Sequence, residues 1–409
     1  MRILYAGNFE WPSEQARAIQ TIHTGHALAR AGANVRLVTM MPAGGPALNS
    51  AQALDLYGLR PHPQFSTGSV RVFRTPSVLD VIEIHKRLAL TNLSYCLAAV
   101  VHLLRTKRQA RPGWVFTRDP RVAWAFLKLR PLTRAHVAYE VHELFGTRPR
   151  DNRSLDSSEQ WGVADRTRTL ERFVLRQSDR LITLTRACRR LIMEGHQIPG
   201  SRVRAIPDGT RQPGEEVAAK PRDRSIFYVG QLYRWKGVEI LLRALRLVEK
   251  ANLTIVGSGE IEHGHDVDRS RLEQLAVDVG VADRVRFCPF VPYREVPRCL
   301  ARASVAVVPL PDVLMSRYFT SPLKLFDAMA AGTPIVASDL ESIREVLRDG
   351  QNSVLVTPDS PEALAAGIRR VLDDPTFART IAATARAEVS QYSWERRAER
   401  ILEFLSEPN

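Results

Sequence analysis

Hydrophobic and polar positions along the chain follow two alternating patterns. Short apolar runs predict buried strands, and longer segments with apolar residues every three or four positions predict amphipathic helices. The predicted strands are RILYA, VRLVTM, WVFTR, HVAYEV, RLITLT and VRAI in the first half, then SIFYV, LTIV, RVRFC, VAVVPL, PIVAS and SVLV in the second. The helices predicted between them include AIQTIHTGHALARAG, VEILLRALRLVEK, SRLEQLAVDVG and SPEALAAGIRRVLDD. Apolar strands that alternate with helices indicate an α/β protein with parallel sheets built from βαβ units.

About six strands in each half fit two doubly wound domains better than one very large sheet. A polar stretch containing Gly and Pro, residues 208–224, marks the predicted boundary. We therefore expect an N-terminal domain over 1–208 and a C-terminal domain over 209–388. The final segment, 389–409, holds a helix that we expect to pack back on the N-terminal domain through one apolar face. That face comprises Trp394, Ala398, Ile401 and Leu405.

The composition is that of a globular protein. Of the 409 residues, 44% are hydrophobic and 25% are charged, which excludes disordered and collagen-like chains. The four cysteines form no CxxC pair, so we expect neither a disulfide scaffold nor a zinc ribbon, but thiols of the reducing cytoplasm. The N-terminus turns polar too early for a signal peptide. The most apolar stretch, residues 88–104, is interrupted by polar residues and predicts a helix of the folded protein rather than a membrane span.

The net charge of +14 is concentrated in one half of the chain. Residues 1–210 carry 31 Lys and Arg against 16 Asp and Glu, whereas residues 211–409 carry 27 against 28. This excess favours an anionic partner: nucleic acid, an acidic membrane leaflet or a phosphorylated substrate. The alternative is a coding bias without a partner, because Arg outnumbers Lys by 51 to 7.

The most informative strand-to-helix junction is YFTSPLKLFDAMAAGTP. We expect Ser321 to cap a helix that begins at Pro322 and stops at Gly332. Lys324 then lies in the first turn, where the helix dipole disfavours a cation by about 0.3–1 kcal/mol. An anion bound at this helix start would reverse that effect; the alternative is a solvated lysine. Asp327, one turn later, is suited to accept hydrogen bonds from a ribose diol, although by itself it would be a surface carboxylate.

Two further junctions lie in the same half. The segment YVGQLYRWKG carries Arg234 and Lys236 just before the helix VEILLRAL. Two helix starts with basic residues are suited to hold a pyrophosphate between them. The GSG at Gly257–Gly259, after LTIV, is explained equally well by a tight turn.

Together, YVGQLYRWKGVEILLRAL, LTIVGSGE, DRVRFCPFVPYREVP and SPLKLFDAMAAGTPIVASDLESIREVL resemble glycosyltransferase family 4. The resemblance covers nearly the whole second half. The first half matches more loosely, through MRILYAG, ALARAGANVRLVT, VFTRDPRVA, YEVHELF and RAIPDG. It implies GT-B architecture, with two Rossmann-like doubly wound domains facing a central cleft. The acceptor would bind the N-terminal domain and a nucleotide-sugar donor the C-terminal one.

The resemblance also implies roles for individual residues. Lys236 would bind the donor diphosphate and His142 would reach the donor sugar, although His142 taken alone would be a structural loop residue. Asp327 takes the place of the second glutamate of the family's Glu–seven residues–Glu motif, which binds ribose. Backbone amides at the helix start would cap the phosphates, and the segment after RVRFC would contact the base. The other residues expected around the donor are Gln231, Arg234, Gly257, Phe290, Val291, Ser321, Leu323 and Lys324.

The chain departs from the family pattern at three places. The first glutamate of the motif is Phe319, which cannot hydrogen-bond a sugar hydroxyl. The family's usual arginine after the first strand of this half is Gln231, so more of the diphosphate charge would fall on Lys236. The first-strand turn has Gly7 followed by Asn8 instead of paired glycines. These departures leave the identity of the donor sugar open.

The family's chemistry is retaining and has no dedicated carboxylate nucleophile. The protein would stabilise the charge of the leaving diphosphate and position the substrates, with no cofactor and no metal ion. A UDP-sugar is the expected donor. The Asp-Val-Asp triplet at Asp266–Asp268 is expected to be a polar loop rather than a metal site.

The acceptor is the open question at this stage. A cell-surface glycan or lipid and a small-molecule natural product both fit, and Arg17, Arg118, Asp119 and Arg121 are candidates to bind it. The run RTKRQAR after the apolar helix leaves peripheral contact with the inner face of a membrane as an alternative to a solvated helix end.

Other functions remain as alternatives. A nucleotide-sugar epimerase or a non-catalytic relative on the same fold stays open. A dinucleotide-dependent oxidoreductase would need a GxGxxG fingerprint, which is absent from the sequence, and no nucleic-acid-binding module is recognised in it.

Overall fold

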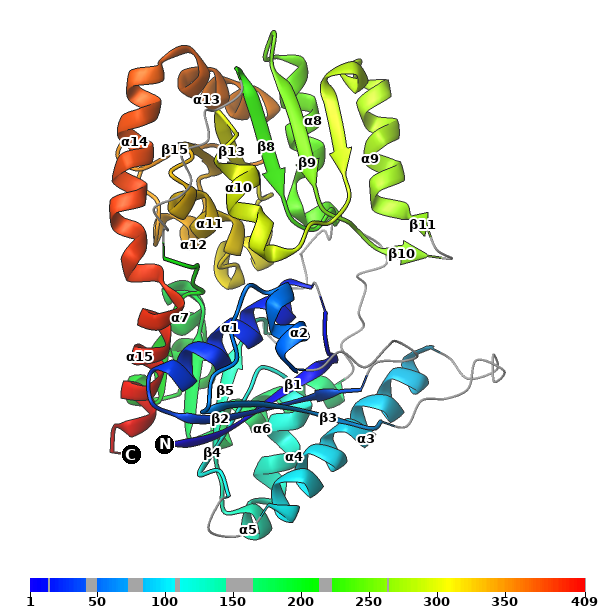
Figure 1. The fold of residues 1–409 in the computed structure, drawn as a ribbon, viewed down its shortest axis with the longest axis vertical. Coiled ribbons are helices and arrows are strands. Elements are labelled where there is room, and N and C mark those ends of the chain that lie inside the picture. Colours follow the sequence, from blue (N-terminus) through cyan, green and yellow to red (C-terminus); the bar gives the residue numbers. More distant parts are fainter. Residues whose placement is uncertain are drawn as a thin grey trace. The chain divides into compact units, whose positions relative to one another are not determined.

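The computed structural model describes residues 1–13, 15–41, 50–72, 84–106, 111–144, 165–212, 223–262 and 265–408. They form two compact units, which are coloured along the chain in Figure 1. The first unit comprises the described residues up to 144, then 165–207 and 394–408. The second comprises the described residues of 208–393. Much of the predicted boundary stretch, residues 213–222, lies outside the described residues.

A parallel sheet organises the first unit. Among the described residues it has seven strands in the order β3-β2-β1-β4-β5-β6-β7. The chain runs outward from β1 to β3 and then continues at β4 on the other side of β1, so the strand order reverses there. The strands are β1 (Arg2–Glu10), β2 (Asn34–Met40), β3 (Phe65–Val70), β4 (Trp114–Thr117), β5 (His136–Val141), β6 (Arg180–Thr183) and β7 (Val203–Ala205).

Helices cover this sheet, and the last helix of the chain is among them. Helix α15 (Trp394–Ser406) packs beside α1 (Ala16–Arg30), as the red and dark blue ribbons in Figure 1 show. Its face includes the buried Trp394, whose ring stacks on His23 at 5.3 Å between ring centres. The other helices are α2 (Ser50–Leu56), α3 (Ile84–Arg105), α4 (Pro120–Lys128), α5 (Arg130–Thr133), α6 (Asp165–Gln177) and α7 (Arg186–His196).

The second unit repeats this architecture with six parallel strands in the order β12-β9-β8-β13-β14-β15. Here the order reverses between β8 and β13. The strands are β8 (Ser225–Val229), β9 (Asn252–Val256), β12 (Val285–Cys288), β13 (Val305–Val308), β14 (Ile335–Ser338) and β15 (Val354–Val356). The helices are α8 (Val238–Arg246), α9 (Val267–Asp278), α10 (Val296–Leu300), α11 (Leu323–Ala331), α12 (Glu341–Arg344), α13 (Pro361–Asp373) and α14 (Pro375–Glu388).

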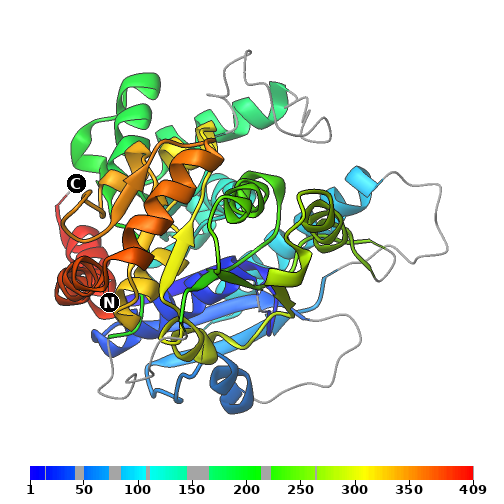
Figure 2. The same cartoon turned by 90° about the horizontal axis from the view of Figure 1, so that it is seen from above.

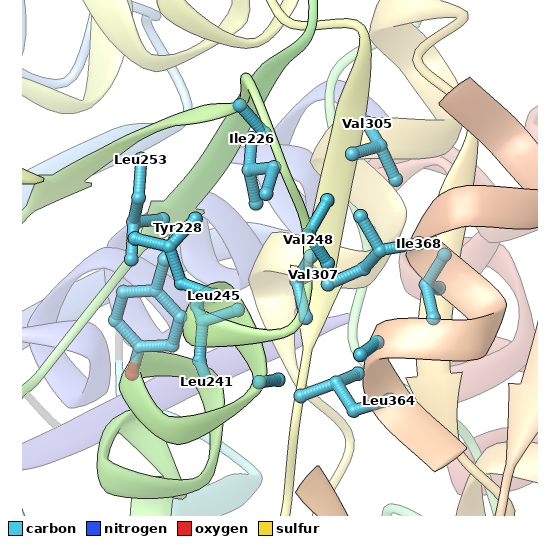
Figure 3. Close-up of a cluster of buried hydrophobic side chains, with 14 of the residues drawn as sticks. Ile226, Tyr228, Leu241, Leu245, Val248, Leu253, Val305, Val307, Leu364 and Ile368 are labelled. Carbon is cyan, nitrogen blue, oxygen red and sulfur yellow. The ribbon is translucent and has the colours of Figure 1, made fainter. Parts of the chain in front are cut away.

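One face of this sheet carries the main core of the second unit. Alternate residues of β8 and β13 point into it, because successive side chains of a strand face opposite sides. Helices α8 and α13 pack against each other over these strands, as the green and orange ribbons in Figure 2 show. Figure 3 shows Tyr228 of β8 in this cluster, with its hydroxyl end beside α8. This apolar core holds β8 and β13 in place, and the candidate site is built from the loops that follow these strands.

All twelve strands predicted from the sequence are present, and both sheets are parallel as expected. Strand β3 was not predicted, because FSTGSV has few apolar residues and lies at a sheet edge with one face half-exposed. The hairpin of β10 (Ile261–Glu262) and β11 (His265–Asp266) was also not predicted. None of the described helices is both long enough and apolar enough to span a membrane.

Candidate functional site

The candidate site of the second unit lies where the strand order reverses. In open α/β sheets, ligands bind beyond the carboxyl ends of the strands at this point. The loops that follow β8 and β13 contact each other there: a Cβ added to Gly237 would lie 1.7 Å from the carbonyl oxygen of Pro309. Gly237 also has a φ of 75°, so both its backbone conformation and its surroundings require glycine. This close contact brings the start of α8 to the loop that leads to α11.

The start of α11 differs from the prediction by one residue. Ser321 does not cap the helix, since its hydroxyl accepts the backbone N–H of Asp208 at 3.1 Å. Pro322 is the capping residue, with extended backbone, and the helix begins at Leu323. No side chain among the described residues caps the helix. The Leu325 N–H donates to the Pro322 carbonyl at 2.9 Å, which leaves the amides of Leu323 and Lys324 at the helix start for a ligand. The helix stops at Gly332, as predicted, and this glycine adopts the left-handed conformation.

Lys324 lies in the first turn of α11, and its ammonium is buried without a hydrogen-bond partner among the described residues. Its Nζ atom lies 3.7 Å from the centre of the Tyr228 ring. Burial lowers the pKa of Lys324 well below its usual value, and the charge of Lys236 lowers it further. Because an unpaired buried cation is unfavourable, the arrangement is suited to an anion that neutralises it.

Lys236 is the second cation of this site. It ends a short 3₁₀ helix, Arg234–Lys236, directly before Gly237 and α8. Its Nζ atom lies 3.4 Å from the centre of the Trp235 ring, and burial lowers the pKa of Lys236 to about 7. The charge of Lys236 lowers the pKa of Lys324, which puts the two predicted lysines within electrostatic reach of each other.

Two glycines leave room beside Lys324. A Cβ on Gly230 would lie 2.8 Å from Nζ of Lys324, and a Cβ on Gly257 would lie 1.9 Å from the carbonyl oxygen of Gly230. Both glycines have positive φ values, 136° and 151°. Gly257 was predicted as a donor-binding residue; its observed contact is with the backbone that carries Gly230. Gly230 itself was not singled out from the sequence, although a glycine directly after a strand signals a close approach.

Asp327 is buried in the middle of α11 rather than at the surface. Its Oδ1 atom accepts hydrogen bonds from the Thr210 hydroxyl at 2.7 Å and from the Tyr293 hydroxyl at 2.9 Å. Burial raises the pKa of Asp327 to about 6, although both hydrogen bonds oppose the rise. Neither Thr210 nor Tyr293 was predicted, because the sequence gives no spacing that would pair them with α11.

The remaining predicted donor residues lie around these elements. Phe290 and Val291 are half-buried in the loop after β12, whose Cys288 carbonyl accepts the N–H of Gly257 at 3.3 Å. The backbone of Gln231 accepts the Tyr228 hydroxyl at 2.6 Å. Arg234 is exposed, and its guanidinium lies 3.6 Å from the carboxylate of Glu239. Phe319 is buried.

His142 belongs to the first unit, directly after β5. Its Nε2 atom lies 2.5 Å from Oε1 of Glu140, which is fully buried. Glu140 also forms a buried ion pair with Arg397 of α15. Burial alone would raise the pKa of Glu140, but Arg397 and His142 outweigh it and lower that pKa to about 2. Burial and the nearby Arg118 lower the pKa of His142 to about 4, against the effect of Glu140.

Other candidates from the sequence have structural roles here. Asp119 caps α4 and forms an ion pair of 2.8 Å with Arg121. Asp266 caps α9, and Asp268 accepts the N–H of Glu260 at 3.0 Å. Among the described residues, no three His, Cys, Asp or Glu side chains are grouped to hold a metal ion.

Two family models match the chain. The model "Glycosyl transferase 4-like domain" matches residues 18–209, and "Glycosyl transferases group 1" matches residues 223–374. Each match falls almost entirely within one unit, and together they cover most of the sequence.

Among the relatives, an uncharacterized glycosyltransferase of Methanocaldococcus jannaschii is 33% identical over 183 residues, which are 44% of each chain. D-inositol 3-phosphate glycosyltransferase 1 of Catenulispora acidiphila is 30% identical over 55% of this chain and 54% of its own length. The chain thus spans about half the length of the curated relatives that it matches.

Solved structures match over the whole chain. Sucrose-phosphate synthase of Thermosynechococcus elongatus aligns with a TM-score of 0.78 and 22% identity, covering 99% of this chain and 98% of that one. HepE of Anabaena in complex with UDP-glucose aligns with a TM-score of 0.71 and 18% identity, covering 99% of each chain. At sequence identities of 22% and 18%, these two structures show a shared fold and nothing more specific.

Proposed function

The chain belongs to the family-4-type glycosyltransferases of GT-B fold, and from this premise we propose that it transfers a sugar from a nucleoside diphosphate donor to a hydroxyl acceptor. The observation that carries the proposal is the buried ammonium of Lys324 at the start of α11, which has no hydrogen-bond partner among the described residues. A diphosphate would neutralise Lys324 and Lys236 and accept hydrogen bonds from amides of the first turn. A UDP-sugar is the proposed donor, supported by the crystal structure of the similar HepE in complex with UDP-glucose.

In the proposed reaction, the protein stabilises the leaving group. Negative charge grows on the diphosphate as its bond to the sugar breaks, and fixed cations in a dry site stabilise that charge more than water does. Lys236 and Lys324 supply the cations, so the proposed chemistry uses no metal ion. The acceptor hydroxyl attacks the face that the diphosphate leaves and passes its proton to a phosphate oxygen, so the configuration at the sugar is retained.

We propose an anionic or lipid-linked acceptor bound by the first unit. The excess positive charge of residues 1–210 supports this choice. Two similar proteins are also named after phosphorylated compounds, D-inositol 3-phosphate glycosyltransferase and sucrose-phosphate synthase. A cell-surface glycan or lipid fits these features better than a neutral natural product does.

The outer face of α3 supports peripheral contact with a membrane. Leu93, Leu97 and Val101 follow one another at four-residue intervals and are 52%, 52% and 42% exposed, and the exposed Arg105 continues the same stripe. An apolar stripe that ends in a basic residue fits a surface of anionic lipid. Residues 107–110 of the basic run lie outside the described residues.

Vesicle sedimentation tests this contact. We expect phosphatidylglycerol vesicles to retain the protein at low salt, and Leu97→Gln to reduce retention several-fold. Val277→Gln is the matched control, since Val277 is a 60% exposed apolar residue of the second unit. Equal recovery from phosphatidylglycerol and phosphatidylcholine vesicles would contradict membrane contact.

A donor screen followed by a transfer assay tests the proposed function. Thermal shifts with UDP, GDP, ADP and TDP identify the base, and the matching labelled nucleotide-sugar is then incubated with phosphorylated and neutral hydroxyl acceptors. We expect a labelled product with the anomeric configuration of the donor, assigned by NMR. Isomerised sugar without an acceptor would indicate an epimerase instead. Nucleotide binding without product or isomer would indicate a non-catalytic relative.

A further inference from the structure

A buried charge pair links the last helix of the chain to His142. Arg397 of α15 is 2% exposed and Glu140 of β5 is fully buried, and they form an ion pair. Arg397 also donates to the carbonyl oxygens of Ile206 at 2.7 Å and Pro207 at 2.6 Å. Burying either charge without the other would be strongly unfavourable, so the two side chains stay paired in one arrangement.

Glu140 accepts hydrogen bonds on both of its oxygens. Oε2 accepts from Arg397, while Oε1 accepts from Nε2 of Gln20 at 2.5 Å and lies 2.5 Å from Nε2 of His142. The amide of Gln20 accepts in turn from Arg118 at 3.3 Å, on its Oε1 atom. Glu140 is therefore fixed by donors from α1, α15 and the loop after β5.

The protonation of Glu140 determines which nitrogen of His142 carries the proton. The pKa of Glu140 is lowered to about 2, so its carboxylate is ionised and can only accept hydrogen bonds. The 2.5 Å contact therefore requires a proton on Nε2 of His142. Burial and Arg118 lower the pKa of His142 to about 4, so at neutral pH its other nitrogen, Nδ1, carries no proton.

We propose that Arg397 and Glu140 are positioning residues that hold His142 as the neutral Nε2–H tautomer, so that Nδ1 accepts a hydrogen bond from a sugar hydroxyl. The described residues give Nδ1 no partner, and the His142 side chain keeps 17% of its surface exposed. The role toward the sugar rests on the proposed glycosyltransferase function. The tautomer itself rests only on the contacts of the first unit.

The same network specifies the chemistry of the ligand. A nitrogen with a lone pair accepts from a hydroxyl and repels an anionic oxygen, so Nδ1 of His142 is suited to a neutral sugar hydroxyl and not to a phosphate. Titration of His142 near its ordinary pKa should also be absent, because burial, Arg118 and Arg397 together lower its pKa to about 4 against the effect of Glu140. The NMR signals of His142 itself should therefore not titrate between pH 5 and 7.

Long-range ¹H–¹⁵N NMR of histidine-labelled protein tests the tautomer, because a ring nitrogen that carries a proton and one that does not resonate far apart. His142→Asn assigns the signal. We expect an Nε2–H tautomer in wild type at pH 7, and loss of this single state in Glu140→Gln, whose amide can donate to Nε2. An Nδ1–H or doubly protonated His142 in wild type would overturn the proposal, whether or not the protein transfers sugar.

Kinetics of the same variants test positioning. We expect Glu140→Gln to lower kcat roughly tenfold or more with a smaller change in KM, as for one hydrogen bond lost near the reacting sugar. If Glu140→Gln does not fold, the double variant Glu140→Gln/Arg397→Met removes both buried charges and should show the same loss. Arg180→Met is the matched control, because Arg180 is a buried arginine that donates to the Phe404 carbonyl of α15 at 3.1 Å. Wild-type kcat in the Glu140 variants would overturn the positioning role.

Discussion

Nζ of Lys324 lies 3.7 Å from the centre of the Tyr228 ring, and among the described residues it has no hydrogen-bond acceptor. A cation over an aromatic face keeps only part of the stabilisation that water would provide. The unliganded protein therefore carries a destabilised charge at this position, which is a common property of binding sites.

Lys324→Met should raise the melting temperature of the unliganded protein by about 2 °C or more at pH 7. Methionine keeps the length of the side chain and removes the unpaired charge. Burial lowers the pKa of Lys324 in the folded state, so its unfavourable effect on stability fades as pH rises toward the usual lysine value. The gain measured by calorimetry should thus shrink between pH 7 and 10. A melting temperature below that of wild type at pH 7 would contradict this view.

Nucleoside diphosphate binding should take up protons. The pKa of Lys236 is about 7 and that of Lys324 is lowered well below its usual value, and a diphosphate favours the charged form of both. Affinity should therefore fall as pH rises from 7 to 9. Titration calorimetry at pH 8 in two buffers of different ionisation enthalpy measures the uptake. Identical heats in both buffers would show that the lysines do not change protonation on binding.

Gly230→Ala should weaken nucleoside diphosphate binding at least tenfold, because its Cβ would lie 2.8 Å from Nζ of Lys324. Gly280→Ala is the matched control. Gly280 also has a positive φ, 72°, but no atom within 4 Å of the added Cβ. Gly280→Ala should lose about 1 kcal/mol of stability from backbone strain. Gly230→Ala should lose more, because its φ of 136° is further from the left-handed helical conformation, so affinities are compared at a temperature where both variants are folded. Equal nucleotide affinity in the two variants would remove Lys324 from the site.

Some residues of the candidate site could be predicted from the sequence, and others could not. Lys324 and Lys236 were predicted from their place at two helix starts, because a cation is unfavourable there without an anion. The strands were predicted because buried parallel strands are nearly continuous apolar runs. Ser321 was wrongly predicted as the helix cap, since a good capping residue also bonds other backbone groups, here the N–H of Asp208.

The distant partners of Glu140 and Asp327 could not be predicted from sequence spacing. Arg397 is 257 positions from Glu140, and Thr210 is 117 positions from Asp327. Only the folded sheet and helices bring such pairs together. A charged residue inside the apolar run HVAYEV was a signal for Glu140, because buried carboxylates are rare unless paired.

Asp327→Asn should raise the KM for the donor several-fold and change kcat little, since a ribose is held alike in the ground and transition states. The amide oxygen can still accept from Thr210 and Tyr293. Burial raises the folded-state pKa of Asp327 to about 6. The free energy of unfolding of the wild-type protein therefore falls as pH rises from about 4 to 6, because the unfolded state releases this proton first. The variant should therefore gain more stability, relative to wild type, at pH 7.5 than at pH 4. A tenfold fall in kcat at unchanged KM would assign Asp327 to the chemical step instead.

Lys236 tests the account of the diphosphate site most directly. Calorimetric titration uses the nucleoside diphosphate that gives the largest thermal shift, with wild type, Lys236→Ala and the exposed-lysine control Lys250→Ala. We predict that Lys236→Ala weakens binding at least tenfold and lowers transfer by about 10²-fold, whereas Lys250→Ala matches wild type. Wild-type affinity and transfer in Lys236→Ala, with unchanged melting, would contradict the assignment of this site to the donor diphosphate.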